Sequence, residues 1–351
     1  MNLRSIREAE IKDKTVLVRV DYNVPMEDGV ITSDLRIAAS LPTIQYLLDS
    51  GVKKIVLISH LGRPEGKKDE NLSLGKTLET LRAILPGPSI GLYEIDHTKT
   101  LDELSKNKID VLENLRFDPR EEENSEEFAK EIVDFVKPDL FVQDGFAVVH
   151  RAHTSTSAIT KLLPSYAGLL LLREVEGLEK AINNPEKPLL LIIGGSKVDD
   201  KAPLIEKFLP IADHIVVGGK IAADGYEAKD DKIYVAEDFD EDSAGAKLDV
   251  GPLSTVKIAD FITDAKTIVW NGLMGKAEDP AYAASSTIVA EMLGEKQDAE
   301  TIICGGDTTG FVEELMYEHP NLDYSLISTG GGAALEFLSG KELPGLAVLS
   351  K

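Results

Sequence analysis

Short apolar runs alternate along the chain with stretches of helical periodicity. The apolar runs are rich in Val, Ile and Leu, and they predict strands at Val16–Val20, Lys54–Ser59, Ile109–Leu115, Leu140–Gln143, Leu189–Ile193, His214–Val217, Lys232–Val235, Thr267–Val269, Thr301–Cys304 and Ser325–Ser328. Helices are predicted between them at Leu35–Asp49, Ser125–Phe135, Arg173–Asn183, Pro280–Leu293, Phe311–His319 and Ala333–Leu338. Nearly continuous apolar strands that alternate with helices are typical of a parallel sheet covered on both faces. The pattern therefore predicts an α/β, doubly wound fold.

The length of the chain and a break in this rhythm predict two domains. A chain of 351 residues is long enough for two domains that each bury their own core. The alternation breaks at residues 162–168, and a long helix with Glu174, Glu176, Glu179 and Lys180 follows. We therefore expect two doubly wound, Rossmann-like parallel-sheet domains, 1–160 and 188–333, joined by a linker and hinge helix at 161–187.

The charge balance restricts the partners of the protein. The formal net charge is −23 and the pI about 4.7, so the chain repels nucleic acid and anionic membranes at long range. The single cysteine, Cys304, allows no internal disulfide, and no apolar signal core or membrane-length apolar run occurs. We therefore expect a cytoplasmic protein without nucleic-acid or membrane partners. The acidic run at 121–123 predicts a solvated approach to a helix.

The basic residues differ in type between the two halves of the chain. All ten arginines lie at or before Arg173, and the second half uses lysine alone. Arginine binds carboxylate and phosphate through two parallel hydrogen bonds, whereas lysine acts as a point charge. The asymmetry predicts two anion sites of different design.

Polar side chains follow successive strands of the first half, where ligands bind in an open parallel sheet. Together with Arg36 at the start of the first helix, these residues are Asp21, Asn23, His60, Arg63, Arg116, Asp144, His150, Arg151 and His153. A single arginine is usually solvated and a single histidine is usually structural. Four successive strand ends with the same content instead predict a site for a small ligand with several negative charges. Asp21 and Asn23 fit hydrogen bonds to a hydroxyl group of that ligand.

Glycine-rich turns follow strands of the second half, at residues 194–201, 304–310 and 328–333. Glycine lets backbone N–H groups approach a phosphate, and a helix N-terminus adds partial positive charge. One such turn alone fits a tight turn or helix packing, but three predict a nucleotide phosphate site. Lys197 and Lys201 share one face if their turn is helical, and Asp307 fits either a magnesium contact or an N-cap.

Several other chemistries lack their sequence signals. The chain contains no P-loop, no dinucleotide fingerprint, no Ser-His-Asp order, no H-E-x-x-H and no cysteine cluster. Cys304 is interpreted as a structural residue at a strand end. A nicotinamide oxidoreductase of the same fold class is disfavoured, since its glycine fingerprint is missing.

Taken together, these strings resemble phosphoglycerate kinases. The matching segments occur in family order at 19–25, 60–64, 113–117, 150–153, 194–198, 270–272, 305–308, 328–333 and 343–345. The resemblance implies reversible, direct in-line phosphoryl transfer between 1,3-bisphosphoglycerate and MgADP, giving 3-phosphoglycerate and MgATP on domain closure in glycolysis or gluconeogenesis. It also implies a monomer whose tail, 334–351, returns to the first domain.

The resemblance assigns the site residues as follows. Substrate-binding residues would be Asp21, Asn23, Arg36, His60, Arg63, Arg116 and Arg151. Nucleotide-binding residues would be Gly194, Lys197, Lys201, Gly218, Asn271, Glu278, Gly305, Gly306, Asp307 and Thr308, with Mg²⁺ on Asp307. The catalytic set would be Arg36, Lys197, Lys201, Gly306 and Gly332. No nucleophile or general base is needed, because the carboxylate of 3-phosphoglycerate is already anionic.

The chain departs from the family pattern at several positions. The substituted positions are Gly145, Ala147, Lys247, Leu273, Ala277 and Cys304. The largest departure is the short segment 223–246, where about one β-α unit of ~30 residues is absent. The phosphate contacts are intact, so nucleotide binding is expected, while the base preference stays open. Two alternatives are a kinase of another acyl phosphate and a non-catalytic binding protein of the same fold.

Overall fold

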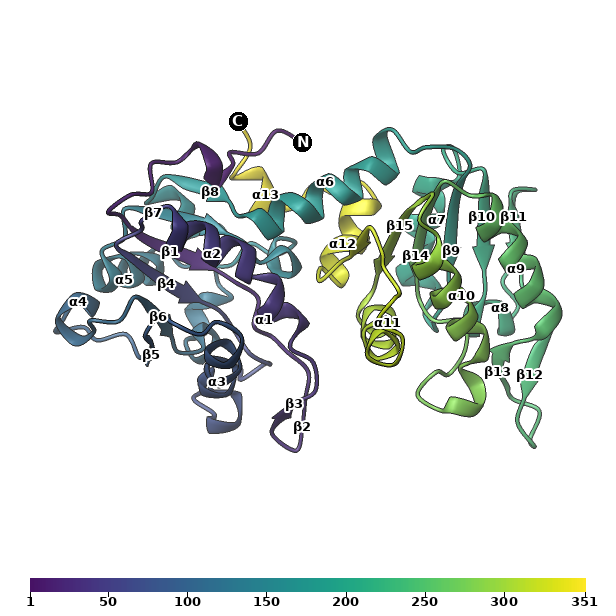
Figure 1. Ribbon diagram of the computed structural model, residues 1–351, viewed down its shortest axis with the longest axis horizontal. Coiled ribbons are helices and arrows are strands. Elements are labelled where there is room, and N and C mark those ends of the chain that lie inside the picture. Colours follow the sequence, from purple (N-terminus) through teal and green to yellow (C-terminus); the bar gives the residue numbers. More distant parts are fainter. The chain divides into compact units, whose positions relative to one another are not determined.

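The computed structural model describes all residues from Met1 to Lys351, and the chain divides into two compact units (Figure 1). Unit 1 comprises Met1–Arg173 and Glu342–Lys351, and unit 2 comprises Glu174–Lys341. The division falls inside helix α6 (Leu169–Asn183), so no separate linker spans 161–187.

The domain boundaries in the structure differ from the predicted ones, and the packing of the segments explains why. Residues 161–173 belong to unit 1, because β8 (Ser165–Ala167) pairs in parallel with β7 (Leu140–Gln143). Residues 334–341 belong to unit 2, where α12 (Gly332–Leu338) packs with α7 (Val198–Phe208). The tail that joins unit 1 therefore begins at Glu342 and not at residue 334. It contains α13 (Pro344–Ala347), and the Arg4 guanidinium donates to the Val348 carbonyl at 2.7 Å.

Unit 1 is built on a six-stranded, fully parallel sheet in the order β5-β6-β4-β1-β7-β8. The remaining strands are β1 (Thr15–Arg19), β4 (Lys54–Ile58), β5 (Ile90–Tyr93) and β6 (Ile109–Leu112). Neighbouring strand residues face opposite sides: Val16 and Val18 enter one core cluster, and Leu17 enters the other. This period of two buries both faces of the sheet, as the doubly wound prediction required.

The helices of unit 1 cover these two faces. The cluster of Val16 and Val18 is closed by α1 (Leu35–Ala39), α2 (Leu41–Asp49) and α3 (Gly75–Ile84). The cluster of Leu17 is closed by α4 (Leu101–Leu104) and α5 (Glu126–Val136). Short 3-10 helices lie at Ile6–Glu8, Glu70–Leu72, Leu115–Phe117, Pro119–Glu121, Phe146–Val148 and Ala158–Lys161, and a hairpin joins β2 (Met26–Glu27) to β3 (Val30–Ile31).

Unit 2 holds a second six-stranded parallel sheet in the order β11-β10-β9-β14-β15-β16. Its strands are β9 (Leu189–Ile193), β10 (His214–Val217), β11 (Ile233–Val235), β14 (Thr267–Asn271), β15 (Glu300–Cys304) and β16 (Leu326–Ile327). The further helices are α8 (Gly219–Ala223), α9 (Pro252–Asp264), α10 (Ala284–Glu295) and α11 (Gly306–Glu318), with a 3-10 helix at Pro280–Tyr282. An antiparallel hairpin of β12 (Phe239–Glu241) and β13 (Lys247–Val250) precedes α9.

The predicted elements differ from the observed ones mainly at their ends. The helix expected at Leu35–Asp49 is two helices, because Pro42 has no N–H to continue the hydrogen bonding of α1 and instead lies in the first turn of α2. Helix α11 begins at Gly306, before the expected Phe311, since glycine and aspartate can open a helix. Strands β5 and β8 were not predicted. No helix is both long and apolar enough to cross a membrane.

Candidate functional site

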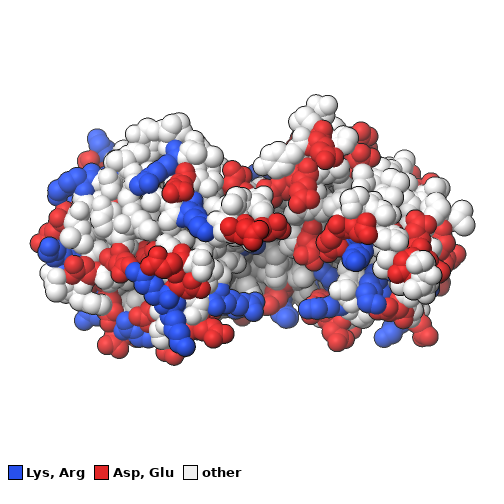
Figure 2. All heavy atoms as spheres, turned by 90° about the horizontal axis from the view of Figure 1, so that it is seen from below, with Lys and Arg blue, Asp and Glu red and all other residues white.

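Basic and polar side chains gather at the carboxyl edge of the unit 1 sheet. We call the seven predicted residues here, Asp21, Asn23, Arg36, His60, Arg63, Arg116 and Arg151, the arginine cluster. Asp21 and His60 each lie two residues beyond the last residue of a strand, β1 and β4 respectively. Arg116 lies in the 3-10 helix that follows β6. Figure 2 shows acidic and basic side chains scattered among other residues over one face of the molecule, whose formal net charge is −23.

Hydrogen bonds tie the inner members of the arginine cluster together. Arg36 forms an ion pair with Asp21, with 2.5 Å between Nη1 and Oδ2. The Asn23 Oδ1 accepts from the Gly62 N–H at 2.8 Å, and the Arg116 Nη1 donates to the Gly62 carbonyl at 2.9 Å. The loop after β4 is therefore held from two neighbouring strand ends.

Two arginines of the cluster stay exposed. Arg63 forms no hydrogen bond or ion pair with the rest of the protein, and Arg151 donates from Nε to the His150 Nε2 at 3.1 Å. No contact links either of them to Asp21, Asn23 or Arg36. Their guanidinium groups are the ones left to bind an anion through two hydrogen bonds.

Two histidines near the cluster, His60 and His153, have lowered pKa values that favour the neutral imidazole. Burial, followed by the charges of Arg19, Arg116 and Arg36, holds the pKa of His60 well below 6.5. Burial and then Arg116 lower the pKa of His153 to about 4. The positive charge of this edge therefore comes from the arginines, and His60 contributes hydrogen bonding alone.

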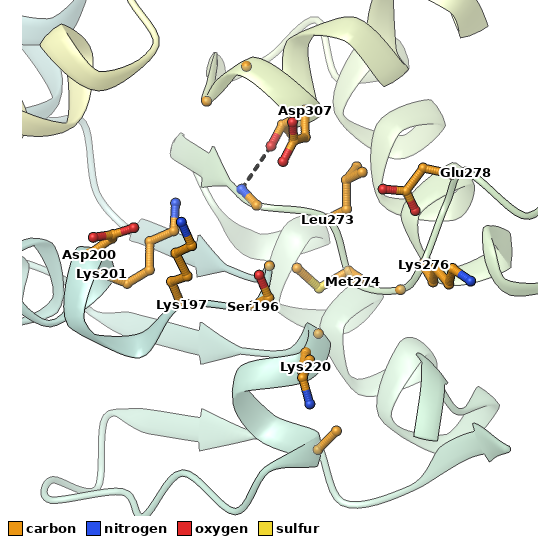
Figure 3. A pocket seen from close by; sticks show the side chains of 18 of the residues that line it. Ser196, Lys197, Asp200, Lys201, Lys220, Leu273, Met274, Lys276, Glu278 and Asp307 are labelled. Carbon is orange, nitrogen blue, oxygen red and sulfur yellow. Dashed lines mark hydrogen bonds between the residues drawn. The ribbon is translucent and has the colours of Figure 1, made fainter. Parts of the chain in front are cut away.

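A cavity of about 460 Å³ opens at the carboxyl edge of the unit 2 sheet (Figure 3). We call it the lysine–glycine cavity. The predicted residues that line it are Lys197, Lys201, Glu278, Gly305, Gly306, Asp307, Thr308 and Gly332.

The two predicted lysines stand at the start of α7. Lys197 is the N-cap and Lys201 lies one turn later, so both side chains reach the cavity. The Lys201 Nζ donates to the Asn271 Oδ1, and the buried Asn271 Nδ2 donates to the Cys304 carbonyl at 3.0 Å. Burial lowers the pKa of Lys201 from 10.5. Asn271 thus positions Lys201 from behind the cavity wall.

Backbone amides at two helix starts face the same cavity. Gly305 precedes α11 with φ +99°, where a side chain would also approach the Asn271 Nδ2 to 2.9 Å. No side chain caps α11 or α12, and a Cβ on Gly306 or Gly332 would meet no heavy atom within 4 Å. The first-turn N–H groups and the helix dipole of α11 therefore lie open to an anion.

Thr308 lines the cavity but also has a supporting contact. Its Oγ1 accepts a hydrogen bond from the Gly272 N–H at 2.8 Å. This bond fixes the turn after β14, from which Leu273 and Met274 enter the cavity wall.

Three predicted nucleotide-binding residues do not line the cavity: Gly194, Gly218 and Asn271. A Cβ on Gly194 would lie 2.2 Å from the Leu273 carbonyl oxygen, and one on Gly218 would lie 2.7 Å from the Met274 Sδ. These glycines permit close packing of the backbone behind the wall, so the structure gives them a supporting position instead of a lining one.

The rest of the lining was not among the predicted site residues. Its members include Lys220, Phe239, Lys247, Leu248, Met274 and Lys276. Phe239 and Lys247 belong to the β12–β13 hairpin, and the Lys247 Nζ lies 4.6 Å from the centre of the Phe239 ring. An isolated aromatic residue and a lysine carry no motif, so only their position in the hairpin identifies them. In the sequence, Lys247 stands out only as a departure from the family pattern.

The residues present fit a magnesium ion that arrives with a phosphate ligand. No group of three or more His, Cys, Asp or Glu side chains is arranged to hold a metal by itself. Asp307 places one carboxylate in the lysine–glycine cavity, in the first turn of α11. Mg²⁺ usually takes one or two carboxylates together with phosphate oxygens and water, so a single carboxylate is sufficient here.

The short segment has a defined structure. Helix α8 spans only five residues, Gly219–Ala223, and the chain then reaches the edge strand β11. The β12–β13 hairpin follows directly and supplies the cavity wall.

Comparison with known proteins places the chain in one family along its whole length. The phosphoglycerate kinase family model matches residues 6–242 and 223–341, and the overlap of the two matches falls within the short segment. Phosphoglycerate kinase of Dictyoglomus turgidum is 38% identical over 394 aligned positions, covering 98% of this chain and 97% of the relative. Since this chain has only 351 residues, at least 43 of those 394 positions have no counterpart in it.

Solved structures of the same family also match the chain over nearly its whole length. The phosphoglycerate kinase of Coxiella burnetii matches with a TM-score of 0.79 and 33% identity, covering 99% of this chain and 98% of the other. That of Pyrococcus horikoshii matches with a TM-score of 0.85, 27% identity and the same coverage. From its motifs, its two parallel sheets and these full-length similarities, the chain belongs to the phosphoglycerate kinase family.

Proposed function

We propose that this chain catalyses reversible phosphoryl transfer between 1,3-bisphosphoglycerate and MgADP, giving 3-phosphoglycerate and MgATP. The observation that carries the proposal is the lysine–glycine cavity, where Lys197, Lys201, Asp307 and the open start of α11 lie together. This arrangement suits a polyphosphate, and it persists although the neighbouring segment is short.

The arginine cluster is the proposed site of the phosphoglycerate. The exposed Arg63 and Arg151 would bind its carboxylate or phosphate oxygens. Asp21 and Asn23 would hydrogen bond to its hydroxyl group, which matches a three-carbon phosphorylated acid better than another acyl phosphate. The Arg36–Asp21 ion pair holds the Arg36 guanidinium at the same edge.

The lysine–glycine cavity is the proposed site of the nucleotide. The first-turn N–H groups of α11, Lys197 and Lys201 would contact phosphate oxygens. Asp307 would hold Mg²⁺, which when bound neutralises charge on those oxygens. Glu278 is an exposed carboxylate that repels phosphate, so it would accept hydrogen bonds from ribose hydroxyls. Phe239 and Met274 offer an apolar surface to the base.

The chemistry requires positioning and charge neutralisation more than covalent catalysis. The bond between phosphorus and the carboxyl oxygen of the acyl phosphate breaks, and a bond forms between phosphorus and a terminal β-phosphate oxygen of ADP. The carboxyl oxygen keeps the bonding electrons as a carboxylate, so no general base is needed. Arg36, Lys197 and Lys201 would balance the charge of the transferring group, with N–H groups of Gly306 and Gly332. Closure of the two units to exclude water is part of the proposal.

Three further expectations stay predictions: that the protein is a monomer, that it binds no nucleic acid and that it works in the cytoplasm.

A coupled assay of ATP formation from 1,3-bisphosphoglycerate and MgADP tests the proposal. Arg36→Ala should lose most of the activity while staying folded, and the exposed Arg7→Ala serves as the matched control with full activity. If wild type binds 3-phosphoglycerate but forms no ATP, the protein is a non-catalytic binding protein. If another acyl phosphate is turned over faster, the assigned substrate is wrong.

A further inference from the structure

A network of buried polar residues extends from His60 of the arginine cluster into the protein. It consists of Arg19 (1% exposed), Glu121 (0%), Ser155 (0%) and His60 (4%). Of these only His60 was predicted as a site residue, and Glu121 was expected to be solvated. The 3-10 helix Pro119–Glu121 turns this carboxylate inward, which corrects that expectation.

The guanidinium of Arg19 decides which ring nitrogen of His60 carries a proton. The Arg19 Nη2 lies 3.1 Å from the His60 Nδ1, within hydrogen-bond distance. A guanidinium only donates, so the Nδ1 must be an acceptor. In a neutral imidazole the proton is then on Nε2, which becomes a donor.

No other group competes for the Nδ1. The nearest carboxylate oxygen, the Asp21 Oδ1, is 3.7 Å away, beyond a hydrogen bond. The His60 Nε2 forms no hydrogen bond within the protein. It is not one of the fully buried atoms without a partner, so it is accessible from outside. The Nε2–H is therefore left for a ligand.

Arg19 is itself fixed from behind. Its Nε donates to the Ser155 Oγ at 2.8 Å, and the Ser155 hydroxyl donates to the Glu121 Oε1 at 2.6 Å. The Ser155 backbone N–H also donates to the Glu121 Oε2 at 3.1 Å, and the Arg19 Nη1 donates to the Val20 carbonyl. A side chain held at three of its donors cannot rotate away from His60 without breaking buried hydrogen bonds.

We propose that Arg19 is a positioning residue, held by Ser155 and Glu121, that fixes His60 as the neutral Nε2–H tautomer so that it donates a hydrogen bond to the phosphoglycerate. The inference rests on the proposed function of the arginine cluster. It makes His60 a directed donor that does not titrate over the working pH range. The charged or titratable groups that face His60 are Arg19, Asp21, Arg36, Arg116 and His153.

The direct test reads the tautomer in the ligand-free protein. Histidine is labelled with ¹⁵N, and long-range ¹H–¹⁵N correlations are followed from pH 5 to 8. His60→Gln identifies the resonances of this ring. Wild type should show a protonated Nε2 and an unprotonated Nδ1 at every pH. A protonated Nδ1, or an imidazolium at pH 7, overturns the proposal.

Variants separate positioning from a structural role. Arg19→Lys keeps the positive charge but loses the planar donor that bonds to the His60 Nδ1. Ser155→Ala keeps Arg19 but removes the acceptor of its Nε–H. Burial and the nearby positive charges should keep His60 neutral in both variants, but its ring proton should occupy Nδ1 in part of the molecules, which the ¹H–¹⁵N correlations detect. Partial loss of the Nε2–H donor should raise KM for 3-phosphoglycerate several-fold at every pH, with kcat at saturation little changed. Arg7→Lys is the matched control. If folded variants keep the wild-type tautomer and the wild-type KM, Arg19 does not position His60.

Addition of 3-phosphoglycerate then tests the ligand part. A shift of the His60 Nε2 resonance on binding supports the proposal, and its absence in an active enzyme overturns the donor role of His60. If the protein neither binds 3-phosphoglycerate nor forms ATP, the proposed function fails, while the free-protein spectra still decide whether Arg19 sets the tautomer.

Discussion

Replacing Gly306 by alanine should weaken nucleotide binding without lowering the stability of the fold. Gly306 is the first residue of α11, its φ is not positive, and a Cβ there would meet no heavy atom within 4 Å. Alanine can therefore adopt this conformation without strain. Glycine costs about 0.5–1 kcal/mol relative to alanine within a helix, and less at its first residue, so the variant should be unchanged or up to ~1 kcal/mol more stable.

The same methyl group would stand in the lysine–glycine cavity, where the phosphate is proposed to lie. A hydrogen bond between a backbone N–H and a charged acceptor contributes about 1.5–3 kcal/mol, and each 1.4 kcal/mol is a factor of ten. Displacing the phosphate from the start of α11 should therefore raise KM for MgADP by about tenfold to a hundredfold.

Gly310 provides a matched control in the same helix. A Cβ at Gly310 also meets nothing within 4 Å, but Gly310 does not line the cavity. Gly310→Ala should stabilise the protein by up to ~1 kcal/mol, a rise of about 2–4 °C in Tm, and leave KM unchanged. The assays are thermal unfolding without ligand and the coupled assay over a range of MgADP. If Gly306→Ala binds MgADP like wild type, the start of α11 does not hold the phosphate.

Three further predictions concern the pH dependence of stability, a hydrogen bond behind the cavity and the contact with the nucleotide base. Burial raises the pKa of Asp144 to about 7, so native protein binds more protons than unfolded protein between about pH 4 and 7. Its stability should fall by a few kcal/mol as pH rises through that window, and urea unfolding of Asp144→Asn should show a flatter profile; an unchanged profile would contradict the assignment. Thr308→Val removes the acceptor of the Gly272 N–H, so denaturant unfolding should show a loss of about 1–3 kcal/mol, and a neutral result would mean that the bond is not needed. Phe239→Ala should raise KM for MgADP several-fold and leave KM for 3-phosphoglycerate unchanged, and equal effects on both would exclude a contact with the base.

Much of the fold was predicted from local sequence patterns. Apolar strands such as Leu140–Gln143 and Leu189–Ile193 were predicted at their observed ends, because strands covered on both faces read as continuous apolar runs. The same logic placed Asp21, His60 and Arg116 at one sheet edge, since parallel strands end on the same side. Glycines before a helix likewise indicated the start of α11.

Elements without such a pattern escaped prediction. Strands β5 and β8 are short, and β5 contains Gly91 and is only partly buried, so neither reads as an apolar run. They are strands because a neighbouring strand offers its backbone hydrogen-bonding edge, which is a property of the sheet and not of the segment.

The residue types at the two sites follow from the sequence by itself, because anion binding needs arginine, lysine and glycine, and these stand beside recognisable strands. Which of them line a cavity was decided by the tertiary structure. Asn271 and Gly194 look like site residues in sequence, yet they support the wall from behind. Glu121 and Glu174 look like surface charges, yet both are buried, and Glu174 accepts from the Thr329 N–H at 2.7 Å. The physical reason is that burial and hydrogen-bond partners come from segments far apart in the chain, such as 121 and 155, whereas sequence patterns report only neighbours.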